Sequence, residues 1–301
     1  MVSNAQRQTA SAFGFQWQKT DAFDSPEMRA RHHAWLIERY GDVANAPWWA
    51  EYGPRPKVLD AGCGAGLSAI ELFGSRLHRV DYHGVDLSDA YRVAERRFAE
   101  RGYPGTFEQG DITNLRFADA SFDVAFSEGV LHHTDSTAAA LKAVARKIRP
   151  GGRFLFYVYR KKGPIREFTD DFIREKLQGL TPEEAWQALY PLTKLGKLLG
   201  DLHIEIDIPE AIDLLAIPAG KIDLQRFIYW HVFKAFHDPT LSLDELNHMN
   251  FDWYAPKNAH RQTLDEVRRW CTEAGLAIER QVEEPAGITI VAVKSESGSP
   301  Q

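Results

Sequence analysis

The chain has 301 residues, 36 of them basic and 42 acidic, which gives a formal net charge of −6 and disfavours nucleic acid as a partner. Its two cysteines are far apart in the sequence, so neither a disulfide framework nor a zinc module is expected. Residues 1–13 lack the apolar core of a signal peptide and no apolar run is long enough to span a bilayer, so we expect a cytoplasmic protein with no membrane partner.

The stretch from residue 57 to residue 159 alternates short apolar runs with amphipathic segments, which is typical of a parallel sheet covered by helices. A further helix and two strands are expected near the C-terminal end. The pattern therefore predicts an α/β fold of the Rossmann-like, doubly wound type, with a mostly parallel seven-stranded sheet. The strands are expected at 57–61, 79–86, 105–109, 122–126, 153–159, 276–283 and 287–294, and the helices at 67–72, 88–101, 136–149 and 263–275.

The alternation breaks after Arg160, where several helix patterns rich in aromatic residues follow. We interpret residues 161–261 as an inserted α-helical cap that forms the substrate pocket. The core then consists of residues 54–160 and 262–296, and residues 1–53 are a separate N-terminal lid or helical segment. The apolar stretch 13–17 suits a lid over the core, but docking against the cap or against the second subunit of a homodimer fits equally.

The most informative motif is a run of three glycines, Gly62, Gly64 and Gly66, directly after the first expected strand. Glycines at such a turn allow backbone angles closed to other residues and let a ligand approach the main chain. Asp86 follows twenty positions after Gly66, at the end of the second strand, where a carboxylate can bind a ribose diol. A helix cap is the alternative role for Asp86 when it is judged alone.

The stretch 59–66 resembles the signature turn of class I S-adenosylmethionine-dependent methyltransferases. Four further stretches resemble that family in the same order, and the likeness covers roughly residues 54–160 and 262–294. These are Gly84-Val85-Asp86-Leu87-Ser88, Gln109-Gly110-Asp111-Ile112, the run from Phe122 to His133, and the run from Lys147 to Phe154.

The resemblance implies S-adenosylmethionine as the cofactor. It implies that Gly62 and Gly64 face the methionine part of the cofactor, that Asp111 binds the adenine amino group and that Ile112 packs against the adenine ring. An alternative role for Asp111 is to cap the turn that follows it. The other cofactor-binding residues implied are Asp60, Cys63, Gly66, Asp86, Leu87, Ser127 and Glu128.

His132 and His133 follow the fourth strand and are the candidate general bases, because an imidazole titrates near neutral pH. A base is useful when the methyl acceptor is a hydroxyl or an activated carbon. Positioning alone can suffice for other acceptors, since the positive charge on sulfur disappears during transfer. Histidines at such a junction often satisfy backbone groups instead, so both interpretations stay open.

Aromatic residues supply the candidates for substrate binding: Tyr157, Tyr159, Trp253, Tyr254 and Trp17. Tyr157 and Tyr159 are two positions apart and share one face of a strand, so both line the substrate or both pack in the core. Packing is the expectation for these two. No metal is expected, because the histidines and aspartates of the cap lack the spacing of a ligand motif.

We therefore expect an enzyme that moves a methyl group from S-adenosylmethionine to an oxygen, nitrogen or carbon atom of a small-molecule metabolite. An enzyme that binds the same cofactor for cyclisation or decarboxylation is one alternative, and a catalytically inactive nucleoside-binding partner subunit is another. A nicotinamide enzyme is disfavoured, because the spacing Gly62-x-Gly64-x-Gly66 differs from the Gly-x-Gly-x-x-Gly of dinucleotide sites.

Overall fold

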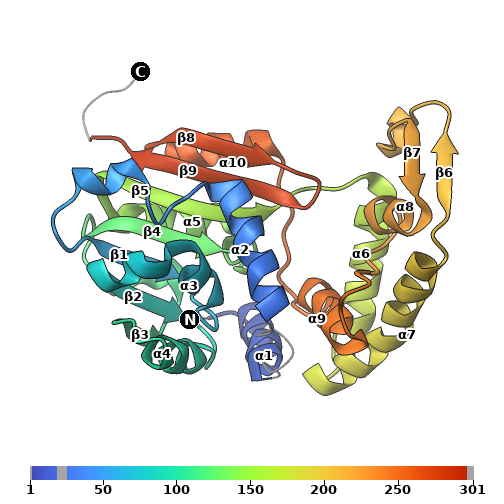
Figure 1. The fold of residues 1–301 in the computed structure, drawn as a ribbon, viewed down its shortest axis with the longest axis horizontal. Helices are drawn as coiled ribbons and strands as arrows, with labels where there is room; N and C mark the ends of the chain where they lie inside the picture. The colour runs from blue at the N-terminus through green and yellow to red at the C-terminus, as the bar shows by residue number, and fades with distance from the viewer. Residues whose placement is uncertain (1, 19–25, 297–301) are drawn as a thin grey trace. The chain divides into compact units, whose positions relative to one another are not determined.

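Seven strands form one sheet in the computed structural model, which describes residues 2–18 and 26–296 (Figure 1). Their order is β3-β2-β1-β4-β5-β9-β8. The first five strands pair in parallel, whereas β9 runs antiparallel to both β5 and β8. The predicted doubly wound, mostly parallel sheet is confirmed. Its strands are β1 Lys57–Ala61, β2 Asp81–Asp86, β3 Thr106–Gln109, β4 Phe122–Glu128, β5 Ile148–Tyr159, β8 Leu276–Glu283 and β9 Gly287–Lys294.

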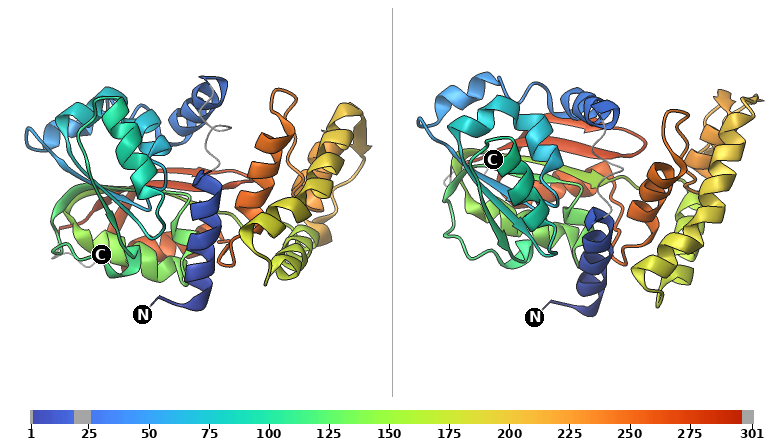
Figure 2. Two further views of the ribbon diagram at one scale, coloured as in Figure 1. Left: turned by 90° about the horizontal axis from the view of Figure 1, so that it is seen from below. Right: turned by 60° about the horizontal axis from the view of Figure 1, so that its bottom comes forward.

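Helices cover both faces of this sheet (Figures 1 and 2). Helices α5 and α10 contact each other on one face, and α2 and α3 contact each other on the opposite face. The central strands are buried on both faces, which explains their nearly continuous apolar sequences. The helices are α1 Asn4–Gln18, α2 Pro26–Tyr40, α3 Leu67–Phe73, α4 Tyr91–Glu100, α5 Thr137–Lys147 and α10 Leu264–Glu273, with short 3-10 helices at Pro47–Glu51, Gly74–Arg79, Ile112–Asn114 and Leu131–His133.

The boundary between α5 and β5 differs from the prediction. The Pro150-Gly151-Gly152 sequence suggested a turn between a helix ending at Arg149 and a strand starting at Arg153. The helix ends at Lys147, and β5 starts at once because Ile148 already pairs with Phe122 of β4. An irregularity in the pairing between Phe122 and Val124 accommodates the Pro-Gly-Gly sequence inside the strand.

The chain divides into two units. The first contains the sheet and comprises the described residues up to Arg160 and from Asn258 onward, and the second comprises Lys161–Lys257. Residues 258–261, which we had assigned to the insertion, thus belong to the first unit. Two backbone bonds hold this segment there, from His260 N to His132 O and from Gln262 N to Tyr159 O, both at 2.9 Å.

The second unit is not purely helical. Besides four helices it contains a two-stranded antiparallel sheet, which the sequence analysis missed. The segment from Glu205 to Ile208 alternates acidic and apolar residues with a period of two, which is the signal for such a strand. No described helix is both long and apolar enough to cross a membrane. The elements are α6 Pro164–Leu177, α7 Pro182–Asp201, β6 Glu205–Ile208, a 3-10 helix Asp213–Leu215, β7 Gly220–Asp223, α8 Leu224–His231 and α9 Leu243–Tyr254.

Candidate active site

The glycine turn after β1 has a backbone that favours glycine at three positions. Gly62, Gly64 and Gly66 have φ angles of +94°, +48° and +78°, in the left-handed region that side chains disfavour. The amides of Gly62 and Cys63 both donate to the carbonyl of Val85, at 2.8 and 3.0 Å, and so tie the turn to β2. The turn therefore presents main chain at the carboxyl edge of the sheet, where open α/β sheets bind ligands.

Two segments distant in sequence pack against this turn. A Cβ atom on Gly62 would lie 2.3 Å from Cγ1 of Val130, in the loop after β4. A Cβ atom on Gly64 would lie 3.5 Å from Nε1 of Trp17, on α1. The first distance is far below a van der Waals contact, so position 62 has no room for a side chain.

Asp86 connects the end of β2 to the glycine turn. Its Oδ2 accepts a hydrogen bond from the amide of Gly64 at 2.9 Å, and its Oδ1 accepts from the amide and hydroxyl of Ser88 at 2.8 and 2.7 Å. Burial raises the pKa of Asp86. The bonds to Ser88 hold the loop after β2, whereas the N-cap residue of α4 is Ala90 without a side-chain cap, so the alternative role of Asp86 as a helix cap is wrong. A carboxylate has about four acceptor positions, so these three bonds leave one position of Asp86 for a ribose hydroxyl.

Asp111 lies at the end of the neighbouring strand β3. Its Oδ1 accepts from the amide and hydroxyl of Thr113 at 2.8 and 2.7 Å, which makes the capping contact that we gave as its alternative role. Ile112 is buried in the main apolar cluster of the sheet. The carbonyl of Leu87 accepts a bond from the side-chain amide of Gln109 at 2.9 Å, which links the loops after β2 and β3. The cofactor roles of these residues stay predictions.

Asp60, Cys63 and Ser127 are buried beneath the turn. Asp60 accepts a bond from the hydroxyl of Tyr82 at 2.5 Å, and burial raises the pKa of Asp60 to about 7. Burial also raises the pKa of the Cys63 thiol well above its usual value, so this thiol is a poor nucleophile. Ser127 has no exposed surface and donates to the carbonyl of Ala61 at 2.7 Å, joining β4 to β1.

Glu128, at the end of β4, is bound by a residue from the N-terminal segment. The hydroxyl of Tyr40, the last residue of α2, donates to Oε2 of Glu128. Burial raises the pKa of this carboxyl group to about 8, and the tyrosine bond opposes that shift. The ring of Tyr40 also packs edge-on against Phe126 of β4. Glu128 is therefore held in one orientation at the carboxyl edge of the sheet.

The Glu128→Gln substitution is expected to make the protein less sensitive to alkaline pH. In the wild type, the unfolded chain loses this proton near pH 4.5 and the folded chain near pH 8, so stability falls as the pH rises between these values. From pH 5 to pH 8.5, the free energy of unfolding of Glu128→Gln should therefore rise by about 2 to 4 kcal/mol relative to that of the wild type. Urea unfolding at both pH values measures this, with the exposed Glu183→Gln as control. Parallel pH dependences in wild type and Glu128→Gln would contradict the assignment.

The two histidines after β4 lie inside the molecule. His132 has no exposed surface, and its ring centroid is 3.7 Å from that of Tyr159. His133 is also buried, and its Nδ1 lies 2.6 Å from the carbonyl oxygen of Asn258. Because a carbonyl only accepts, Nδ1 carries a proton in this contact, and Nε2 is then the basic nitrogen of a neutral ring. His133 thus makes the expected backbone contact and still has the tautomer that a general base requires.

Tyr157 and Tyr159 lie on one face of β5, next to these histidines. Both side chains are buried, and their ring centroids are 6.2 Å apart. Tyr157 also packs edge-on against Trp35 of α2. Gly287 leaves room for this ring, since a Cβ there would lie 2.2 Å from it. Both tyrosines pack as expected, and a role in substrate binding stays a prediction.

Helix α1 contacts the loops that follow three strands. Trp17 approaches Gly64 after β1, Gly14 would place a Cβ 3.8 Å from Cβ of Ser88 after β2, and Phe13 packs edge-on against His133 after β4, with 4.8 Å between the ring centroids. This arrangement puts the apolar stretch 13–17 at the carboxyl edge of the sheet. Residues 19–25 of the expected N-terminal segment lie outside the described residues.

The remaining candidates, Trp253 and Tyr254, belong to the second unit. Both are buried, and both donate to Asp170, from Trp253 Nε1 and from the Tyr254 hydroxyl, each at 2.8 Å. They therefore form part of the interior of that unit. Within residues 2–18 and 26–296, no three His, Cys, Asp or Glu side chains gather as a metal site would require.

Several residues of the site were not found from the sequence. Tyr40, Tyr82 and Val130 contact Glu128, Asp60 and Gly62, respectively. A helix-ending tyrosine, a tyrosine inside a strand and a valine in a loop are each common in any α/β protein. No sequence pattern therefore distinguishes these three residues before the fold is known.

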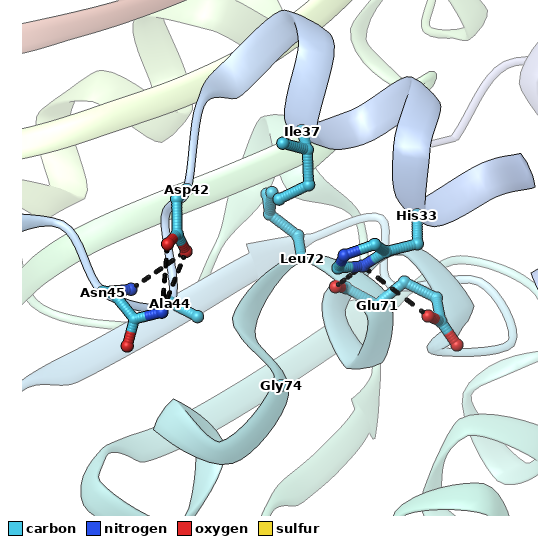
Figure 3. A pocket seen from close by; sticks show the side chains of 8 residues that line it. All are labelled: His33, Ile37, Asp42, Ala44, Asn45, Glu71, Leu72 and Gly74. Carbon is cyan, nitrogen blue, oxygen red and sulfur yellow. Dashed lines mark hydrogen bonds and ion pairs between the residues drawn. The ribbon is translucent and has the colours of Figure 1, made fainter. Parts of the chain in front are cut away.

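A surface groove of about 330 Å³ lies between α2, the loop after it and the end of α3 (Figure 3). His33 bonds to the carbonyl of Glu71 at 2.8 Å on one side, and Asp42 accepts from the amide of Asn45 at 3.3 Å on the other. The groove contacts the C-terminal end of α3, whereas the glycine turn precedes the N-terminal end of that helix. It is therefore separate from the candidate active site.

Known proteins resemble the same part of the chain. A family described as "Methyltransferase domain" matches residues 59–156. The phthiotriol/phenolphthiotriol dimycocerosates methyltransferase 1 of Mycobacterium ulcerans is 35% identical over 130 residues, which are 42% of this chain and 46% of that protein. The ubiquinone/menaquinone biosynthesis C-methyltransferase UbiE of Bdellovibrio bacteriovorus is 32% identical over 169 residues, 52% of this chain and 67% of that protein. The YcgJ protein of Bacillus subtilis, a solved structure, has a TM-score of 0.48 and 16% identity over 89% of this chain and 100% of its own.

The chain spans about half the length of several curated relatives that it matches. The matched region contains the last three residues of β1, the glycine turn and all strand ends at which we place the cofactor residues. The similarity to UbiE extends over two thirds of that protein at 32% identity. Together with the seven-stranded sheet, these similarities show that the chain belongs to the class I S-adenosylmethionine-dependent methyltransferase family.

Proposed function

We propose that this chain transfers a methyl group from S-adenosylmethionine to an oxygen, nitrogen or carbon atom of a small molecule. The observation that carries the proposal is the left-handed turn Gly62–Gly66, whose main chain is joined to the carboxylate of Asp86. S-adenosylmethionine, when bound, supplies a methyl group on positively charged sulfur. The task of the chain is to hold this group in line with the acceptor, with about 3 Å between the reacting atoms.

The residues present fit the cofactor. The half-buried main chain of Gly62 and Gly64 is assigned to its methionine part, beside Val130 and Trp17, which pack against the turn. Asp86 and Asp111 end two adjacent strands, β2 and β3, and offer carboxylates for the ribose and the adenine amino group. Glu128, held by Tyr40, supplies a third acceptor at the end of β4 for an amino group. We assign Asp60, Cys63, Gly66, Leu87, Ile112 and Ser127 to the surrounding cofactor site.

The acceptor molecule is proposed to be bound by Trp17, Tyr157 and Tyr159 of the first unit. The names of the relatives include both C- and O-methyltransferases. The kind of acceptor atom therefore varies among similar proteins, and we assign none to this chain.

Calorimetric titration of the full chain with S-adenosylmethionine and S-adenosylhomocysteine tests the cofactor. Micromolar dissociation constants are expected, and absence of binding at millimolar concentration would reject the proposal. Detection of S-adenosylhomocysteine after incubation with candidate acceptors tests the transfer. Turnover of an acceptor without this product would instead favour the cyclase or decarboxylase alternative.

His133→Asn is expected to lower kcat by about a hundredfold if the imidazole is the general base. Asparagine can still donate to the carbonyl of Asn258 from its side-chain amide, so the packing contact is retained while the base is lost. The rate profile of the wild type should fall below neutral pH as the imidazole becomes protonated, and the variant should lack this fall. The exposed His33→Asn is the control. Full turnover in both His133→Asn and His132→Ala would leave positioning as the sole contribution.

A further inference from the structure

One buried carboxylate of the second unit accepts four hydrogen bonds. The Oδ2 atom of Asp170, on α6, accepts from Nε of Arg166 at 2.6 Å and from Nε1 of Trp253 at 2.8 Å. Its Oδ1 accepts from the hydroxyl of Tyr254 at 2.8 Å and from the amide of Lys234 at 3.4 Å. These bonds join α6, α9 and the segment after α8. The acceptor capacity of Asp170 is thereby used, and its charge neutralises Arg166.

Four cationic groups surround the indole of Trp253. The distances to its ring centroid are 4.9 Å for Arg174, 5.1 Å for Lys234, 5.4 Å for Arg166 and 5.5 Å for Lys162. Arg166, Arg174 and Lys234 are at least 94% buried as whole residues. An indole stabilises a nearby cation by less than the burial of an ion costs.

The positive charge in this cluster exceeds the negative charge. Arg174 has a carboxylate partner in Asp171 at 3.3 Å, but the Asp171 side chain is 59% exposed. The ammonium of Lys234 makes no hydrogen bond or ion pair with any residue in 2–18 or 26–296. Burial lowers the pKa of Lys234 to about 8, and Asp252, which lies beyond ion-pair distance, opposes this shift. Lys234 is therefore mostly protonated at neutral pH, and no described carboxylate lies within ion-pair distance of its ammonium.

We propose that the second unit contains a binding site for one oxyanion group, a carboxylate or a phosphate of a small molecule, formed by the ammonium of Lys234 in the positive field of Arg166 and Arg174. An ammonium group of a residue as buried as Lys234 is usually paired with an acceptor, because an unpaired one has lost much of its water without compensation. An anion supplies both the missing charge and the missing acceptors. This site does not depend on methyl transfer.

The donors determine the kind of ligand. Arg166 uses Nε on Asp170 and Nη1 on the carbonyl of Tyr229, and Arg174 uses Nε and Nη2 on the carbonyl of Trp253. The two guanidinium groups thus contribute mainly charge. Lys234 has three N–H donors and acts as a point charge, which suits a single compact oxyanion better than an extended polyanion.

Titration of the full chain with sodium phosphate, and separately with sodium acetate, tests the proposal by thermal unfolding at constant ionic strength maintained with chloride. At least one anion should raise the Tm of the wild type, and the anion that does so identifies phosphate or carboxylate as the preferred group. Lys234→Met should weaken this response at least tenfold. Lys197→Met, which removes an exposed lysine paired with Asp201 at 2.8 Å, should respond as the wild type does. Equal responses in all three proteins, or none to either anion, would overturn the proposal.

Lys234→Met should also change the Tm in a definite direction when no anion is added. Removing an unpaired buried charge should leave the Tm of Lys234→Met equal to or above that of the wild type, whereas a purely structural cation would give a lower Tm. If this variant does not fold, the wild type itself provides the test. Acetylation followed by mass spectrometry should show Lys234 protected at least fivefold by the stabilising anion while Lys197 is unchanged. Equal acetylation of Lys234 with and without anion would reject the site.

Discussion

Gly62→Ala is expected to reduce the affinity for S-adenosylmethionine at least a hundredfold and to destabilise the fold by about 2 to 5 kcal/mol. Two costs add at this position. The backbone has φ +94°, which disfavours any residue with a Cβ atom, and that Cβ would lie 2.3 Å from Cγ1 of Val130. The loop carrying Val130 must therefore move. That loop leads directly to His132 and His133, so the damage extends from the cofactor turn to the candidate base.

Gly102→Ala is the matched control for this prediction. Gly102 also has a positive φ, +71°, but nothing lies within 4 Å of the Cβ that alanine would add. This variant should lose about 1 to 2 kcal/mol from its conformation alone and keep its affinity for the cofactor. Urea unfolding and calorimetric titration measure both quantities. If Gly62→Ala loses no more stability than Gly102→Ala and binds the cofactor as the wild type does, the turn is not the constrained site described above.

The sheet and the cofactor turn were predictable because their signals are local. Parallel strands that are buried on both faces have nearly continuous apolar sequences. Three glycines spaced two apart directly after such a sequence predict the turn. Asp86 and Asp111 were placed correctly at strand ends because the length of each strand follows from its own sequence. The strand β6 was missed although its apolar residues alternate with acidic ones. It has only four residues, and the sequence patterns on either side of it indicate helices.

Long-range contacts were not predictable for a different reason. Tyr40 and Glu128 are 88 positions apart, and the amide of Asn258 bonds to the hydroxyl of Thr9 across 249 positions. Neither partner carries a pattern that specifies the other. The same holds for Asp170, whose sequence context is that of an ordinary surface position on an amphipathic helix. Its neighbours become buried only when α6, α8 and α9 pack together, and the unpaired charge of Lys234 is visible only then.

Asp86→Ala is expected to weaken binding of S-adenosylmethionine about a hundredfold, or roughly 2.7 kcal/mol, while the protein remains folded. The carboxylate holds the amide of Gly64 at 2.9 Å and is the proposed acceptor for a ribose hydroxyl, so both the shape of the turn and a ligand contact are lost. Stability should change less than affinity. Burial raises the pKa of Asp86, which shows that its charge is costly in the fold, and alanine removes this cost along with the bonds.

Ser88→Ala separates the ligand role of Asp86 from its role in holding the loop after β2. This variant removes the hydroxyl that donates to Asp86 Oδ1 at 2.7 Å but leaves the carboxylate and its bond to Gly64 intact. Its cofactor affinity should stay within about threefold of the wild type, because the two bonds lost, to Asp86 and from the amide of Ala90, are local and worth about 1 kcal/mol each. If Asp86 only holds this loop, both variants should lose stability and neither should lose affinity. A large loss of affinity in Asp86→Ala alone is therefore evidence for ribose binding, because the contact between Asp86 and Ser88 is weakened in both proteins and only one of them lacks the carboxylate.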